Sequence, residues 1–195
     1  MDVTEFWAVI EAARAEIGYS IGDDAGDEMA EALERQLGAL TPGEIVDFAV
    51  EFDRLHELAH RWDVWAAAYL IMDGCSDDGF IDFRAGLIAL GRGTFESVLD
   101  DPDSLAAHAE VRAIAAGDLS EDALSMEEVN YAAEQAYERV TGEVDTFADE
   151  VAAREGEREP VQPDPAGEDW DFDDDEQMRV HLPRLAALFL SESDG

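Results

Sequence analysis

The most regular pattern in this sequence is a stripe of apolar side chains in the middle of the chain. Apolar residues recur there at alternating steps of three and four, which is the spacing of one face of an α-helix. The segment Thr41-Pro42-Gly43-Glu44 supplies a start signal, because it combines a capping box with a proline at the first helical position. The pattern predicts a long buried helix that could break near Trp62. The stripe comprises Ile45, Phe48, Phe52, Leu55, Ala59, Trp62, Ala66 and Tyr69.

Shorter stretches with helical spacing occur on both sides of this central helix. Thr4 is the expected N-cap of a first helix, and Ser76 is the expected N-cap of the helix that follows the central one. Ser125 begins a second capping box that ends at Glu128. No strand pattern of comparable strength occurs. We therefore predict an all-α, single compact domain of about seven to nine helices.

The composition changes after residue 154. Residues 155–168 contain three prolines among charged residues and glycine, which predicts a linker on the surface. In residues 169–195, Trp170 and Phe172 stand in an acidic run and an amphipathic helix interrupted by Pro183 follows. We predict a helical domain over residues 1–154, with one more helix over 144–154, and a tail that docks back on this domain through the two aromatic side chains.

The chain is extremely acidic. It has 49 Asp and Glu residues against 12 Arg and no Lys, which gives a formal net charge of -37. Such a field repels nucleic acid and anionic membranes and attracts basic protein surfaces or cations. We therefore expect no nucleic-acid and no membrane partner, and a basic protein is the possible partner. The same charge could also arise from a GC-rich genome that replaces Lys with Arg, or from adaptation to a salty cytosol.

Cysteine content and hydropathy point to the cytoplasm. Cys75 is the only cysteine, so the chain cannot form an internal disulfide, as is usual in a reducing compartment. The first residues lack the basic segment and apolar core of a signal peptide. No apolar window approaches the length of a membrane-spanning helix. These features predict a soluble cytoplasmic protein.

One short motif suggests a metal. His56, Glu57 and His60 match the H-E-x-x-H pattern, in which two histidines on one helix face bind zinc and the glutamate activates a water. Arg54 and Arg61 flank this match, whereas zinc-protease helices favour uncharged neighbours there. Residues for the extended motif are missing, and no sheet is expected above the helix. We predict no metal or other cofactor, and we retain a zinc-dependent hydrolase as the alternative.

A lone cysteine near a helix start is a second chemical candidate. The N-terminus of a helix stabilises a thiolate, so Cys75 could have a lowered pKa. No histidine lies near it in the sequence to act as a base. The alternative is a small, buried, unreactive side chain.

The segment from Arg61 to Leu105 resembles the bacterial domain-of-unknown-function family 4240. The similar segments are R-W-D-x-W, G-C-S-D-D-x-F-x-x-F-R and D-P-D-S-L, and they follow an N-terminal E-F-W. The acidic tail is similar to that of actinobacterial members. The family has no assigned activity, so the resemblance implies a compact cytoplasmic domain and supplies no catalytic residues. A site, if present, is expected in its polar segment, which comprises Arg61, Asp63, Cys75, Ser76, Asp77, Asp78 and Arg84.

A structural role for this polar segment competes with the functional one. Arg61 and Arg84 could pair with Asp63, Asp77 or Asp78 and so tie two central helices together across their loop. The function that the sequence favours is a non-catalytic, acidic interaction or regulatory module.

Overall fold

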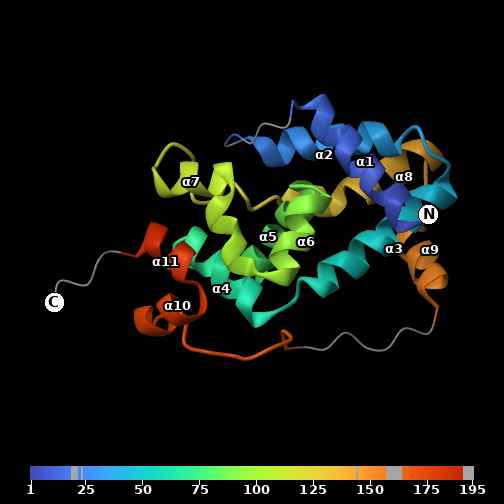
Figure 1. The fold of residues 1–195 in the computed structure, drawn as a ribbon. Helices are drawn as coiled ribbons and strands as arrows, with labels where there is room; N and C mark the ends of the chain where they lie inside the picture. The colour runs from blue at the N-terminus through green and yellow to red at the C-terminus, as the bar shows by residue number, and fades with distance from the viewer. Residues whose placement is uncertain (19–21, 23, 144, 157–163, 191–195) are drawn as a thin grey trace.

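The computed structural model describes residues 1–195 except 19–21, 23, 144, 157–163 and 191–195 (Figure 1). Within the described residues the chain is helical, and a single isolated β-bridge is its only extended pairing. The all-α prediction is confirmed, although the helices outnumber the expected seven to nine because several of them are short. The helices are α1 (Val3–Glu16), α2 (Ala25–Leu37), α3 (Pro42–Leu58), α4 (Trp62–Ile71), α5 (Asp77–Ala89), α6 (Arg92–Asp100), the 3-10 helix η1 (Pro102–Ala107), α7 (Ala109–Ala115), the 3-10 helix η2 (Glu127–Tyr131), α8 (Ala132–Thr141), α9 (Phe147–Glu155), α10 (Asp175–His181) and α11 (Pro183–Phe189).

The predicted central helix exists as two pieces. Its capping box is present, since the Thr41 hydroxyl accepts from the Glu44 N–H and the Glu44 carboxylate accepts from the Thr41 N–H at 2.8 Å. The helix breaks slightly before Trp62, at residues 59–61. Ala166 from the C-terminal segment binds both sides of this break, donating to His60 O at 2.9 Å and accepting from Trp62 N at 3.0 Å. The break is therefore held by a distant part of the chain.

The apolar stripe forms the core, as its spacing predicts. Phe48 is 1% exposed and stacks on Phe6 from α1, with ring centroids 4.6 Å apart. Helix α5 crosses the same core and approaches the backbone of residues 123–126 closely. A Cβ on Gly86 would lie 2.0 Å from Leu124 O, so this contact requires glycine. The short approach fixes α5 against the segment that leads into η2 and α8.

Of the three other predicted helix starts, two are wrong and one is confirmed. The N-cap of α1 is Asp2, which forms a capping box with Glu5, and Thr4 lies inside the helix. After Ser125 the chain enters η2 with Met126 at the cap position and no side-chain cap hydrogen bond, before α8 begins. Ser76 caps α5 as predicted, because its hydroxyl accepts from Gly79 N at 3.1 Å.

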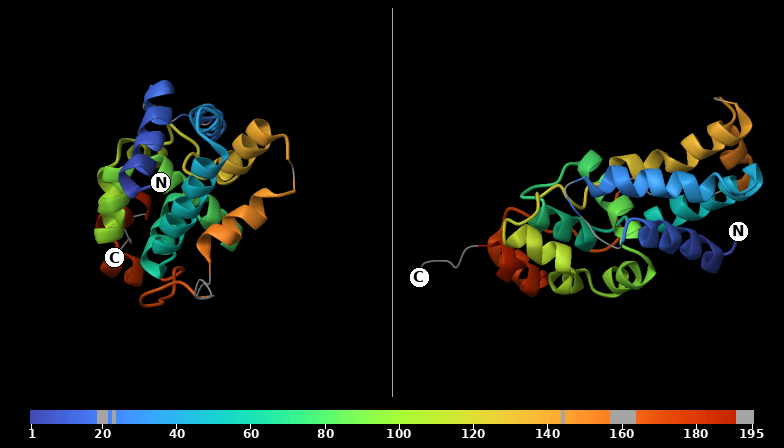
Figure 2. Two further views of the ribbon diagram at one scale, coloured as in Figure 1. Left: turned by 90° about the vertical axis from the view of Figure 1, so that its right-hand side faces the viewer. Right: turned by 90° about the horizontal axis from the view of Figure 1, so that it is seen from above.

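The tail docks on the body, as predicted. Helix α11 lies against α4, η1 and α7, and α10 packs on α11 (Figures 1 and 2). Phe172 contacts the rings of Trp62, Trp65 and Tyr69, and Trp170 stacks on His181. The division of the chain at residues 154 and 168 stays a prediction, since 157–163 of the linker and 191–195 of the tail lie outside the described residues.

Candidate functional site

The arginine at the start of the polar segment serves as a structural clamp. The Arg61 guanidinium donates to Asp63 at 2.9 Å, and it also donates to Leu99 O at 2.5 Å. The predicted pairing with Asp63 is therefore present. Through its contact with Leu99 O, Arg61 links the start of α4 to the end of α6.

The second arginine of the segment has a different role from the predicted one. Arg84 is buried, and among the described residues it forms no ion pair with Asp77, Asp78 or any other carboxylate. It donates to His56 O at 2.9 Å, so its positive charge lies at the carbonyl end of α3. Burial lowers the pKa of Arg84 to about 10. Arg84 thus caps α3.

The other members of the polar segment do not converge. Asp77 and Asp78 are exposed in the first turn of α5, where they complement the helix dipole. Cys75 is half-buried, and burial raises the pKa of its thiol to about 11. The expectation of a lowered pKa is therefore wrong, because loss of water around the thiolate outweighs the nearby helix start.

The geometry of the H-E-x-x-H match gives no support to a zinc site. Helix α3 ends at Leu58, so His60 lies beyond the helix and does not share a helix face with His56. The His56 Nε2 is 3.0 Å from Ile81 O, and burial, followed by the Arg84 charge, lowers the pKa of His56 to about 3. Burial also lowers the pKa of His60. In the part of the chain that the structure describes, no three His, Cys, Asp or Glu side chains are grouped to hold a metal.

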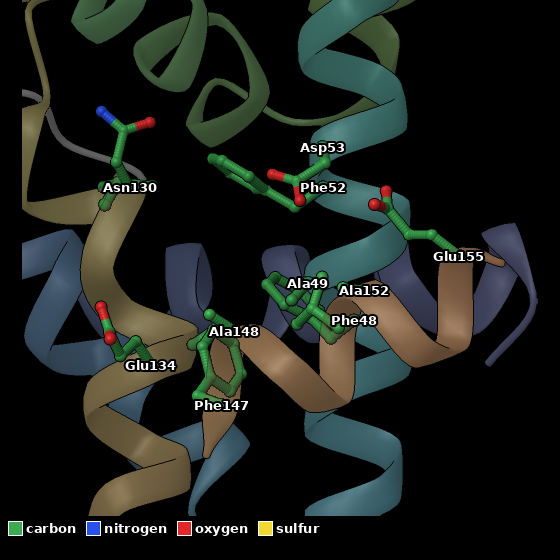
Figure 3. Close-up of a pocket in the computed structure, with 13 residues that line it drawn as sticks. Phe48, Ala49, Phe52, Asp53, Asn130, Glu134, Phe147, Ala148, Ala152 and Glu155 are labelled. Carbon is green, nitrogen blue, oxygen red and sulfur yellow. The ribbon is translucent and has the colours of Figure 1, made fainter. Parts of the chain in front are cut away.

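A cleft that the sequence did not predict lies beside the middle of α3, between α3, η2, α8 and α9 (Figure 3). Its volume is about 340 Å³. Nine of the thirteen residues that line it are apolar. They include Phe48 and Phe52 from α3, Val129 and Ala133 from η2 and α8, and Phe147 and Val151 from α9. Such a space is large enough for several apolar side chains of a ligand.

Acidic side chains border this apolar cleft. Asp53 and Glu155 lie near one another at one end in Figure 3, and Glu134 lies beside Phe147 at the other. Asn130 is the remaining polar group in the lining. The arrangement can accept a ligand that combines apolar groups with positive charge. Sequence spacing placed Phe48 and Phe52 in the core stripe, but it gave no sign that α9 would leave space above them.

A second, shallower hollow lies between α6 and η1. Thr94 and His108 line it, with Thr94 Oγ1 3.4 Å from His108 Nε2, and His108 Nδ1 is 2.6 Å from Glu110. A hydroxyl, an imidazole and a carboxylate in this order can activate a nucleophile. Here the first contact is long and the buried Nδ1 lacks an aligned hydrogen bond, so this arrangement does not form a proton relay. The acid-rimmed cleft is the stronger candidate site.

Comparison with known proteins identifies the family of this chain. Searches of curated proteins and of solved structures returned no match. No helix of the described residues combines the length and apolar character that crossing a bilayer requires. A family model described as "Protein of unknown function (DUF4240)" matches residues 1–139, which include α3, η2 and most of α8. The chain therefore belongs to this family, as its polar segments suggested.

Proposed function

We propose that the protein is a non-catalytic interaction module whose acid-rimmed cleft receives a basic segment of a partner protein. The observation that carries this proposal is a cleft that combines apolar side chains with carboxylates at its border, in a chain with a net charge of -37. A charge that served only salt adaptation would not require an apolar recess beneath it. We place the interaction in the cytoplasm, which suits a chain with a single cysteine.

The apolar side chains and the carboxylates of this site have distinct physical roles. Apolar side chains that enter the cleft gain affinity from buried surface, at about 25 cal/mol per Å². The acidic field raises the association rate of a basic partner, and it disfavours acidic ones. Because the carboxylates are near the surface, salt should weaken the complex. This dependence would distinguish a charge-steered contact from a purely apolar one.

The direct test uses a probe peptide of about 15 residues, built of leucine and lysine in amphipathic helical order. Glu134→Lys places a positive charge on the cleft, whereas Glu138→Lys makes the same change on α8 away from the cleft lining. We expect Glu134→Lys to weaken binding about tenfold and Glu138→Lys about twofold or less, because the close pair dominates. Fluorescence anisotropy would measure both dissociation constants. Equal effects of the two variants would show that the peptide binds the acidic surface without using the cleft.

A further inference from the structure

Helix α9 packs on the body without burying any of its side chains fully. It lies across α3 and α8, yet none of its nine residues is fully buried. Its two cleft-lining anchors, Phe147 and Val151, are one helical turn apart and both are half-buried. The unfilled volume of about 340 Å³ lies between these side chains and the floor. Side-chain atoms that face this open cleft make fewer packing contacts than atoms in a filled core, which weakens the interface.

The N-terminus of α9 also lacks side-chain hydrogen bonds. Its N-cap residue, Thr146, makes no side-chain cap hydrogen bond, and its buried hydroxyl lacks a partner among the described residues. Phe147 rests on Tyr137 with ring centroids 5.3 Å apart, and Arg154 forms an ion pair with Asp47. The ion pair is partly exposed, and a pair of this kind contributes little stability.

The charge of α9 has the wrong sign for the surface that it covers. Asp149 and Glu150 stand in its first turn, and Arg154 is its only basic residue. Across the cleft lies Glu134, which is acidic as well. A basic helix with the same apolar spacing would keep the contacts of Phe147 and Val151 and would bring positive charge to the acidic border of the cleft. This difference gives such a helix an electrostatic advantage over α9.

The family comparison separates α9 from the groove beneath it. The residues of α3 and η2 that form the floor lie within the matched region, residues 1–139, whereas α9 lies outside it. The groove is therefore built by the family domain, and α9 is a later segment of this chain that covers it.

We infer that α9 is a self-ligand, which a basic amphipathic helix of the partner displaces from the groove of α3, η2 and α8. This inference rests on the proposed function, because it names the form of the partner and the step that admits it. The recognition mode is a helix laid in an apolar groove, with anchors one turn apart. While α9 covers the groove, only the uncovered fraction of molecules can bind, so the apparent affinity is lower than the intrinsic one.

The test asks whether one substitution tightens or weakens binding of the probe peptide. Phe147→Ala removes the aromatic anchor of α9 without changing the charge. If the Leu/Lys probe peptide displaces α9, this variant should bind the peptide about three- to tenfold more tightly than the unmodified chain, because more molecules have an open groove. If the peptide packs beside a fixed α9, the variant loses a contact and binds more weakly. Hydrogen exchange gives a second readout, since added peptide should speed exchange over residues 147–155 upon displacement and slow it otherwise.

The outcomes separate this inference from the proposed function. Tighter binding with faster exchange in α9 supports displacement. Weaker or unchanged binding with slower exchange overturns displacement and leaves the cleft as the binding site. Absence of binding to either protein rejects the proposed function itself. If Phe147→Ala does not fold, Arg154→Gln replaces it, with Arg92→Gln on α6 as the charge-matched control; equal affinities of these two variants would overturn the inference.

Discussion

Two segments follow the matched region of the chain, and they are attached to it in different ways. Helix α9 contributes no fully buried side chain and leaves a cleft beneath it. Helices α10 and α11 instead bury Met178, Leu182, Leu185 and Ala186. Figure 1 shows the two segments at opposite ends of the molecule. One segment completes the core, and the other covers a surface.

Hydrogen bonding deepens this contrast. Asp103, which is 3% exposed, accepts from Arg184 N at 3.0 Å, from Leu185 N at 2.8 Å and from Arg184 Nε at 2.9 Å. A buried carboxylate thus caps α11 and binds its arginine, whereas the start of α9 has no side-chain cap. The two segments therefore differ in their attachment although both follow the matched region, and α9, which buries no side chain fully, is the one suited to exchange.

The largest expected effect comes from shortening one apolar side chain in each of the two segments. Leu185→Ala removes a side chain that is 0% exposed, so we expect a loss of about 2 to 5 kcal/mol in the free energy of unfolding. Val151→Ala in α9 should cost less than about 1 kcal/mol, because its side chain already borders empty space. Denaturant unfolding would measure both. Leu188→Ala, at a 38% exposed position of α11, controls for loss of a leucine from that helix. Equal losses at residues 151 and 185 would contradict the contrast.

The next test concerns the cap of α11. Asp103→Ala leaves the backbone N–H groups of Arg184 and Leu185 and the Arg184 Nε–H without their acceptor, so we expect a loss of about 3 kcal/mol. Asp101→Ala removes the exposed carboxylate that binds the same arginine and should cost about 1 kcal/mol or less. Hydrogen exchange over residues 183–189 should accelerate in the first variant and change little in the second. A similar acceleration in both would show that ion pairing to Arg184, and not the buried cap, holds the tail.

Some local features of the fold could be predicted from the sequence, although the caps expected at Thr4 and Ser125 were wrong. Features that depend on distant segments could not be predicted. The capping box at Thr41 and the cap at Ser76 are made within one turn, so a few neighbouring residues determine them. The end of α3 depends instead on Arg84 and on Ala166, which meet it only in the folded chain. The sequence pattern therefore ran the helix through residue 60 and placed both histidines on it.

The cleft illustrates the same limit for the candidate site. The stripe residues Phe48 and Phe52 were recognisable as apolar, and residues 144–154 as helical. Whether a helix fills the space above a stripe depends on its docking angle and distance, and periodicity does not encode these. Because acidic residues are so frequent in this chain, the sequence gives no reason to single out Glu134.

The final prediction concerns His56, near the end of α3 and close to the break where Ala166 rejoins the body. Burial and the Arg84 charge lower the pKa of His56 from 6.5 to about 3. Between these values the unfolded chain binds a proton that the folded chain does not, so stability must fall as the pH falls. From about pH 7 to pH 5 this residue should remove about 2 kcal/mol from the free energy of unfolding.

Substitution isolates this effect from the general relief of charge repulsion that acid brings to so acidic a protein. His56→Gln keeps a donor for Ile81 O but cannot take up the proton. The difference in unfolding free energy between the variant and the unmodified chain should therefore shift in favour of the variant as the pH falls from about 7 to 5. Parallel curves would mean that His56 is accessible to water. In that case the end of α3, like α9 and unlike the tail, would be a loosely packed part of the molecule.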